Sequence, residues 1–357
     1  MNLTEIISLT KELIAAFGPC GQEEAVRQIV QRELQKTCDE VWVDGSENVV
    51  GVIRAESTAD HKTPSVQLAA HMDEISMIVK RVEPDGTLSL RNMGGIKPWV
   101  FGLGPVSIMG DIRTIEGVLS VGPLHSTHET PKAWRSKVVG GGLTLDWPQI
   151  HVFTRLSAEQ VAAAGVHAGT RVVIHPTRRH LIEIEDCLCG HFIDDRALLA
   201  VMLATAARIK ASGKRPPADI YFAGTCSEEI AAGPATNSAY LIKPDAFVAL
   251  EIGPATEEFG TLLSGDPIIL YRDARTLYSK PLCDKLVKAG KSRGMQPQCA
   301  IFENYGTDAG FARSAGFVGQ ASVVAIPTDN THGFEITPKA ALENITELLV
   351  AYLEQPF

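Results

Sequence analysis

Residues 218–233 read Ala-Asp-Ile-Tyr-Phe-Ala-Gly-Thr-Cys-Ser-Glu-Glu-Ile-Ala-Ala-Gly, a short apolar run that breaks at a glycine before two adjacent carboxylates, Glu228 and Glu229. We interpret the run as a buried strand that carries charge to its own C-terminal edge. In an open α/β sheet, ligands bind beyond the carboxyl ends of the strands, so these carboxylates are well placed for chemistry. Neighbouring carboxylates repel each other, and one stays protonated unless a cation lies beside them. An isolated Glu-Glu pair is usually a solvated acidic turn, so a metal site is expected only if other strand ends carry similar side chains.

A second apolar run, residues 65–70, leads directly into His71. In the sequence His71-Met-Asp73, an extended chain places both side chains on the same face, so Asp73 can hold the imidazole in the tautomer that a metal needs. A lone histidine at a strand end is more often an ordinary surface or core residue. His71 is therefore a candidate ligand only together with residues from elsewhere in the chain.

Two further apolar runs, residues 246–250 and residues 322–326, also lead into ligand-type side chains. The first ends in Glu251, and the second leads after five residues to His332. Imidazole nitrogen and carboxylate oxygen are both ligands of zinc and similar ions. Strand ends that are far apart in the sequence therefore carry the same kind of chemistry.

Asp194 completes the set of candidate ligands. It stands beside Asp195 where an apolar helix over residues 197–210 begins, a position that favours anions, although aspartates are also common helix caps. Together, two imidazoles and three carboxylates match a pair of divalent ions, if one carboxylate bridges the ions and each ion takes one histidine and one further carboxylate. The candidate ligands are His71, Asp194, Glu229, Glu251 and His332.

The composition is that of an ordinary soluble globular protein, with 357 residues, 45% hydrophobic and 21% charged. The net charge of -9 argues against nucleic acid or an anionic membrane as a partner, because both select for basic surfaces. No apolar run reaches the length of a membrane span, and the first residues lack the features of a signal peptide, so a cytoplasmic location is expected. Seven scattered cysteines indicate reduced thiols rather than a disulfide framework.

The sequence predicts an α/β fold with a β-rich insertion. Helical and β-like patterns alternate in the first and last parts of the chain, whereas short β-like runs dominate from about residue 75 to about residue 185. A polar stretch inside that region, His125–Gly142, is expected to be a loop. We therefore predict a catalytic domain formed by residues 1–74 and 185–357, and an inserted β domain over residues 75–184.

In combination, these motifs resemble those of one family, the co-catalytic metallo-aminopeptidases of the tetrahedral-aminopeptidase family. That family includes glutamyl and deblocking aminopeptidases and proteins once labelled endoglucanases. The similarity runs in order from Gly18-Pro-Cys-Gly-Gln-Glu23 to the last helix. The motifs that carry it are His71-Met-Asp73-Glu74, Asp194-Asp-Arg196, Ser227-Glu-Glu229, Glu251, Gly306-Thr-Asp-Ala-Gly310 and His332-Gly-Phe-Glu335.

The resemblance implies a zinc-peptidase fold, with a mixed sheet flanked by helices and an inserted β-barrel-like domain that serves as a dimerisation or lid domain. It also implies a homo-oligomer, with dimers as building blocks and dodecamers common in the family. Carried over by position, His71, Asp194 and Glu251 hold one metal ion. A second ion is held by Asp194, Glu229 and His332, so that Asp194 bridges the two.

By the same resemblance, Glu228 is the general base and Asp73 orients His71. This chain departs from the family at Glu251, where aspartate is usual, and at Gly333-Phe334, where Ser-Pro is more common. Both departures keep the ligand chemistry, but they put the shape of the pocket near the last histidine in doubt.

The expected reaction is the removal of N-terminal residues from peptides. Two cations roughly 3.5–4 Å apart would share a bridging hydroxide, and Glu228, which is not used as a ligand, would move the proton from the attacking water to the leaving amine. A free α-amino group on one metal would restrict cleavage to the first peptide bond. Zinc is the expected metal, with cobalt and manganese as alternatives.

The sequence is also compatible with other classes of function. Related folds act as metallo-deacylases or carboxypeptidases, and Arg196 or Arg272 could bind a substrate carboxylate. A non-catalytic assembly protein with a structural metal is a further alternative, although structural sites leave no spare carboxylate such as Glu228 beside the ligands. A glycosidase is the weakest candidate, because its paired carboxylates give the two histidines no role.

Overall fold

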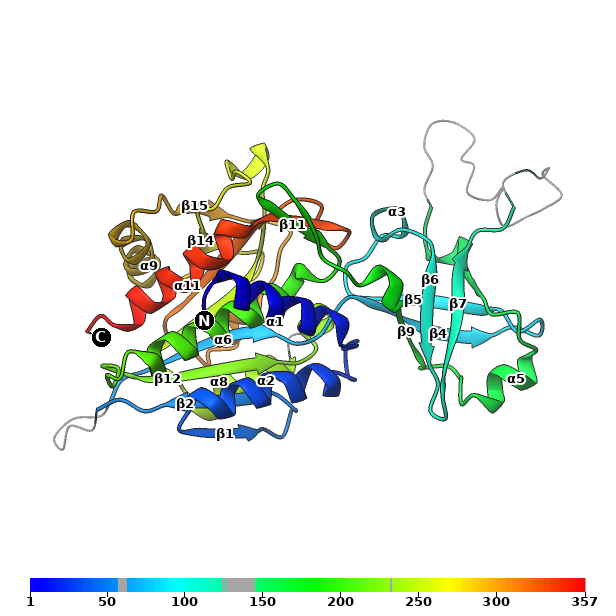
Figure 1. Cartoon of the computed structure of the whole chain (residues 1–357), viewed down its shortest axis with the longest axis horizontal. Coiled ribbons are helices and arrows are strands. Elements are labelled where there is room, and N and C mark those ends of the chain that lie inside the picture. Colours follow the sequence, from blue (N-terminus) through cyan, green and yellow to red (C-terminus); the bar gives the residue numbers. More distant parts are fainter. Residues whose placement is uncertain (57–62, 124, 126–144, 232, 357) are drawn as a thin grey trace. The chain divides into compact units, whose positions relative to one another are not determined.

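The structure is a computed structural model, and it describes residues 1–56, 63–123, 125, 145–231 and 233–356 (Figure 1). The stretch predicted to be a loop, His125–Gly142, lies almost entirely outside these residues. Contacts within the chain divide it into two units, which we call the α/β unit and the barrel unit. The α/β unit comprises Met1–Glu74, Leu181–Thr331 and Glu335–Phe357. The barrel unit comprises Ile75–His180 and His332–Phe334.

The α/β unit is built around a mixed sheet. Its strands are β1 (Glu40–Val43), β2 (Val49–Ile53), β3 (Ser65–His71), β12 (Asp219–Thr225), β13 (Ala246–Pro254), β14 (Ile268–Arg272), β15 (Gln298–Ile301) and β16 (Ala321–Thr328). In the part of the chain that the structure describes, these eight strands follow the order β1-β2-β12-β3-β13-β16-β14-β15 (Figure 1). The four central strands β12, β3, β13 and β16 are parallel and almost completely buried, as expected for parallel strands with both faces covered.

Helices cover this sheet. They are α1 (Leu3–Ala15), α2 (Glu24–Thr37), α6 (Ile193–Ala211), α8 (Gly233–Ile242), α9 (Lys280–Ser292), α10 (Asp308–Ser314) and α11 (Lys339–Leu353). α6 packs against β3, β12 and β13 and also contacts α1, α2 and α11, so its side chains from Ile193 to Ala206 are buried on every side. This explains why its sequence from Ala197 to Leu203 is apolar all round. The predicted mixed sheet flanked by helices is confirmed.

A small antiparallel sheet leads into the start of α6. It consists of β10 (Ile182–Ile184), β11 (Cys187–Gly190) and β17 (Glu335–Pro338), in that order. The pairing of β11 with β17 places Gly190 opposite Glu335. Gly190 lies four residues before Asp194 in the sequence, so this pairing brings Glu335 close to Asp194. The Glu335 carboxylate then accepts a hydrogen bond of 3.1 Å from the Asp194 amide, which fixes the backbone of this candidate ligand.

The barrel unit contains β4 (Ser76–Val82), β5 (Leu88–Met93), β6 (Pro105–Met109), β7 (Thr114–Ser120), β8 (His151–Phe153), β9 (Arg171–Ile174) and the short helix α5 (Ala158–Ala163). The strands close into a barrel in the order β4-β5-β8-β7-β6-β9 (Figure 1). Burial alternates along β7, as expected when every second side chain faces the interior. The expected β-barrel-like fold of the insertion is confirmed. None of the helices in the described part of the chain combines the length and apolar character that crossing a bilayer requires.

Candidate metal centre

Parallel strands bring candidate ligands to one edge of the central sheet. β12 lies beside β3 with Thr225 opposite His71. On its other side, β3 pairs with β13 as far as Ala69 opposite Ala249, and two residues further along the two strands come His71 and Glu251. Because parallel strands end at the same edge, His71 lies between the end of β12 and Glu251.

The His71 imidazole is buried, and both of its ring nitrogens have partners. Its Nε2 lies 3.0 Å from Asp194 Oδ1, and its Nδ1 lies 3.2 Å from the carbonyl oxygen and 3.4 Å from Oδ1 of Asp73. A proton on Nδ1, donated toward Asp73, leaves the lone pair on Nε2, where a metal would be bound. Burial alone would lower the pKa of His71, but the hydrogen bonds to Asp194 and Asp73 raise this pKa well above its usual value.

A compact group of ligand atoms surrounds His71. One ligand atom of each member lies within 4.8 Å of the others, and the members are His71, Asp194, Asp195 and Glu251, all buried. Sequence reasoning gave no role to Asp195. Its Oδ2 accepts a hydrogen bond of 3.0 Å from the His71 amide, and its Oδ1 has no hydrogen-bond partner among the described residues. The Asp-Asp pair was the available signal, but a sequence does not show which of two adjacent carboxylates faces the site.

The donor set fits a divalent cation. Burial is the main reason why the pKa values of Glu251 and Asp195 lie well above their usual range, and neighbouring carboxylates, such as Glu228 beside Glu251, raise them further. A buried cluster of acids with one imidazole is therefore unfavourable without a cation. Carboxylate oxygens and a neutral imidazole nitrogen are the ligands that zinc and similar ions bind, so the residues present match a metal site.

The turn that carries the two predicted catalytic carboxylates directly follows β12. Ser227 adopts a left-handed backbone conformation, with φ of 57°, and the short helix α7 (Glu228–Ala231) follows it. The amides of Glu228 and Glu229 donate to Asp73 Oδ1 and Oδ2 at 3.0 and 3.1 Å. One carboxylate therefore holds both amides of the turn as well as contacting the imidazole.

The Glu228 side chain is half-buried and lies in a strongly acidic environment. Burial is the largest cause that raises its pKa well above the usual value; His71 opposes the shift, and Asp308 and Glu229 add to it. A carboxylate whose pKa is raised in this way takes up a proton more readily than an exposed glutamate does, as a general base must.

Glu229 lies close to Asp194, since one ligand atom of each lies within 4.8 Å of the other. Asp194 thus neighbours both Glu229 and the group around His71, the position that a bridging carboxylate needs. His332 belongs to the barrel unit, where its Nδ1 lies 3.2 Å from the Gly95 carbonyl oxygen. A proton on Nδ1 would leave Nε2 free as a ligand. That His332 meets Glu229 stays a prediction.

Arg196 is occupied by partners inside the protein. Its guanidinium is fully buried, donates to the Met72 carbonyl oxygen and forms an ion pair of 2.7 Å with the equally buried Glu74. This pair ties the start of α6 to the segment that follows β3. Arg196 therefore cannot serve as the receptor of a substrate carboxylate, whereas Arg272 is exposed at the end of β14.

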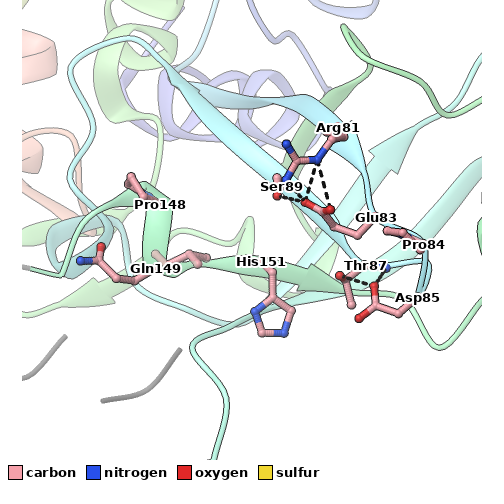
Figure 2. Close-up of a pocket in the computed structure, with 10 residues that line it drawn as sticks. Arg81, Glu83, Pro84, Asp85, Thr87, Ser89, Pro148, Gln149 and His151 are labelled. Carbon is pink, nitrogen blue, oxygen red and sulfur yellow. Dashed lines mark hydrogen bonds and ion pairs between the residues drawn. The ribbon is translucent and has the colours of Figure 1, made fainter. Parts of the chain in front are cut away.

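A separate cavity of about 520 Å³ opens on the barrel unit (Figure 2). None of its lining residues is a predicted site residue. Arg81 donates to Glu83 at 2.7 Å, Ser89 also donates to Glu83, and Thr87 donates to Asp85 at 2.7 Å, as Figure 2 shows. Because these charged groups are paired with their neighbours, the cavity lacks the convergent ligands found near His71.

The sequence pattern of the family described as M42 glutamyl aminopeptidase matches residues 51–348. Among curated proteins, the lysyl aminopeptidase of Pyrococcus furiosus is 28% identical over 246 residues, which are 68% of this chain and 65% of that protein. This chain therefore spans slightly less than two thirds of that relative.

Solved structures share the fold. An aminopeptidase from the archaeon Desulfurococcus kamchatkensis has a TM-score of 0.86 and 24% identity, over 99% of this chain and 95% of that chain. The TET1 peptidase of Pyrococcus horikoshii, described as able to assemble into a tetrahedron or a large octahedral shell, has a TM-score of 0.84 and 19% identity, over 98% and 99% of the two chains.

Proposed function

Because this chain belongs to the M42 glutamyl aminopeptidase family and is therefore a peptide hydrolase, we propose that it removes N-terminal residues from peptides with two divalent cations and Glu228 as general base. The observation that carries this proposal is the buried group of ligand atoms around His71, with Glu229 near Asp194. The Glu228 carboxylate belongs to neither group of ligand atoms, yet it is close enough to Glu251 to raise the pKa of that residue. A closed structural site would leave no such spare carboxylate.

In this proposal, His71, Asp194 and Glu251 hold one ion, and Asp194 also binds a second ion together with Glu229 and His332. Asp195 would support this site by holding the backbone of His71 in place, through the hydrogen bond that it accepts from the His71 amide. Zinc is the metal that these nitrogen and oxygen donors favour, and cobalt or manganese would be accepted by the same donors. When bound, such ions polarise the scissile carbonyl and lower the pKa of the attacking water.

The residues of the chain supply orientation and proton transfer. Glu228 would accept a proton from the attacking water on its carboxylate and later deliver it to the leaving amine. Asp73 would keep Glu228 in place, because it accepts the amide hydrogen bonds of both Glu228 and Glu229. It would also hold the proton on Nδ1 of His71, so that Nε2 is presented as a ligand.

The proposed substrates are peptides with a free α-amino group. Anchoring of that amine beside the reacting carbonyl would limit cleavage to the first peptide bond. A carboxypeptidase would instead need a cation for the substrate carboxylate, and the burial of Arg196 in its pair with Glu74 counts against that alternative.

We further propose that the chain assembles into a homo-oligomer with a dimer as its building block, and that it acts in the cytoplasm. The shells described for the TET1 peptidase, which has the same fold, support the first point. The seven free cysteines support the second, because a reducing compartment keeps such thiols reduced.

A comparison of free and blocked substrates tests the proposal. We expect the purified protein to cleave amino-acid p-nitroanilides that have a free amine and to leave their N-acetylated forms intact. A metal chelator should abolish cleavage, and added zinc should restore it. Equal cleavage of acetylated and free substrates would contradict an aminopeptidase and favour a deacylase.

A further inference from the structure

The segment Gly18–Glu23, between α1 and α2, contacts residues next to the proposed metal centre, and the proposed function assigns it no task. Its backbone runs alongside the residues that follow β3: Pro19 forms a parallel bridge with Glu74, and the Glu74 amide donates to the Gly18 carbonyl oxygen at 2.9 Å. The segment is therefore held by main-chain contacts against Glu74, the neighbour of Asp73, independently of its side chains.

Cys20 touches the carboxylate that organises the site. Its buried thiol donates to Asp73 Oδ2 at 3.1 Å. The same oxygen accepts the Glu229 amide, and Oδ1 accepts the Glu228 amide. A carboxylate surrounded by several donors has one orientation in which all of them are satisfied, so the thiol limits how Asp73 can rotate.

Glu23 contacts the turn that carries Glu228 and Glu229, through the side chain of Ser227. The Glu23 carboxylate is almost completely buried, and its Oε1 accepts hydrogen bonds from the Gly21 amide at 2.7 Å and from the Ser227 hydroxyl at 3.3 Å. Ser227 directly precedes the proposed base, and its left-handed conformation is one that a non-glycine residue keeps only when its surroundings hold it there. Glu23 supplies part of that restraint.

We propose that Cys20 and Glu23 are positioning residues: acting through Asp73 and Ser227 respectively, they fix the orientation of Glu228 and Glu229. This inference rests on the proposed function, because it gives Glu228 the role of base and Glu229 that of ligand. The inference explains why the segment Gly18–Glu23, which is distant in the sequence from Asp73 and Ser227, contacts each of these two residues through a separate side chain.

The alternative is that Cys20 only fills space, as buried cysteines commonly do. Cys283 offers a matched control, because its thiol is also buried and donates to a main-chain carbonyl, that of Leu270, at 3.3 Å. Cys283 lies on α9 and has no contact with Asp73 or with the turn among the interactions of the described residues.

The test compares Cys20→Ala, Cys20→Ser and Cys283→Ala, each loaded with cobalt, by steady-state kinetics and by the visible absorption of the bound ions. We expect Cys20→Ala to lower kcat by about 10- to 100-fold with little change in KM, since the base and a ligand are displaced while substrate binding is kept. Cys20→Ser keeps a donor and should restore most of kcat. The cobalt spectrum should change in Cys20→Ala and stay unchanged in Cys283→Ala.

An equal fall in kcat in Cys20→Ala and Cys20→Ser, or an unchanged cobalt spectrum in Cys20→Ala, would overturn the inference. If Cys20→Ala does not fold, Ser227→Ala tests the same idea through Glu23, with a fall in kcat and a changed spectrum as the expected result. A wild-type protein that binds cobalt but cleaves no p-nitroanilide would instead contradict the proposed function, and the cobalt spectra would still decide the role of Cys20.

Discussion

At the scale of single residues, the site depends on side chains that orient the candidate ligands as much as on the ligands themselves. Asp73, Asp195 and Glu335 each accept hydrogen bonds from the main-chain amides of candidate site residues. Such contacts fix the backbone of a ligand before any ion is bound, which lowers the entropic cost of metal binding.

The buried ion pair of Arg196 and Glu74 gives a prediction at this scale. Arg196→Met would leave Glu74 buried without its cation, and we expect the free energy of unfolding to fall by about 3–5 kcal/mol. Urea unfolding followed by circular dichroism measures this change. The double variant with Glu74→Gln should recover a large part of the loss, because it also removes the stranded charge. Equal stability of Arg196→Met and the wild type would show that the pair has no such role.

The candidate ligands could be predicted from the sequence because each follows an apolar run or opens a helix, whereas the choice of Glu228 rather than Glu229 as the base comes only from the resemblance to the family. The contributions of Asp195 and Cys20 could not be predicted, because nothing in local sequence shows that their side chains turn toward His71 and Asp73. Such contacts join residues more than fifty positions apart, so they depend on how the whole chain packs.

At the scale of secondary-structure elements, the sequence predicted where β3 and β12 end but not how they are paired. The parallel register sets Thr225 opposite His71, and α6 packs across both strands and β13. Glu251 was expected at the end of its strand, yet β13 continues to Pro254, because it stays paired with β16 as far as Thr328. Apolar runs predict strands well, whereas their exact ends depend on neighbours in the sheet.

The glycine-rich motif Gly306–Gly310 leads to a prediction about the element α10. A Cβ on Gly310 would lie 2.0 Å from Asp273 Oδ2, and Asp273 already accepts hydrogen bonds from Tyr278 and from the amide of Arg275. We therefore expect Gly310→Ala to lower the free energy of unfolding by about 1–3 kcal/mol, the usual effect of overpacking.

Gly319→Ala is the matched control for Gly310→Ala, because a Cβ there meets no atom within 4 Å. The midpoint of urea unfolding should move for Gly310→Ala and stay within error for Gly319→Ala. Similar midpoints for the two variants would mean that the close contact between Gly310 and Asp273 does not limit stability.

At the scale of the whole molecule, the α/β unit concentrates buried acids around one imidazole, and divalent cations are what would balance them. The raised pKa values of Glu251 and Asp195 mean that, without metal, the folded protein keeps protons that the unfolded chain releases at about pH 4. At these two groups the folded state then binds more protons than the unfolded state, so their contribution to the free energy of unfolding falls as the pH rises above that value.

Metal removal tests this charge balance. Chelated protein should unfold at a lower urea concentration at about pH 8 than at about pH 5. The difference between the two urea midpoints should be smaller once zinc is added back, because the bound ion replaces the protons. An apoprotein that is as stable at the higher pH as at the lower one would contradict the balance.

The central claim is that distant side chains meet around two cations while Glu228 stays free to move protons. Metal content and turnover, measured together on Glu228→Gln, test it most directly, with the exposed Glu257→Gln as control. We predict two metal ions per chain in both variants, wild-type turnover in Glu257→Gln, and turnover reduced by about 10²- to 10⁴-fold in Glu228→Gln. Near-wild-type turnover in Glu228→Gln, or the loss of an ion from it, would contradict the claim.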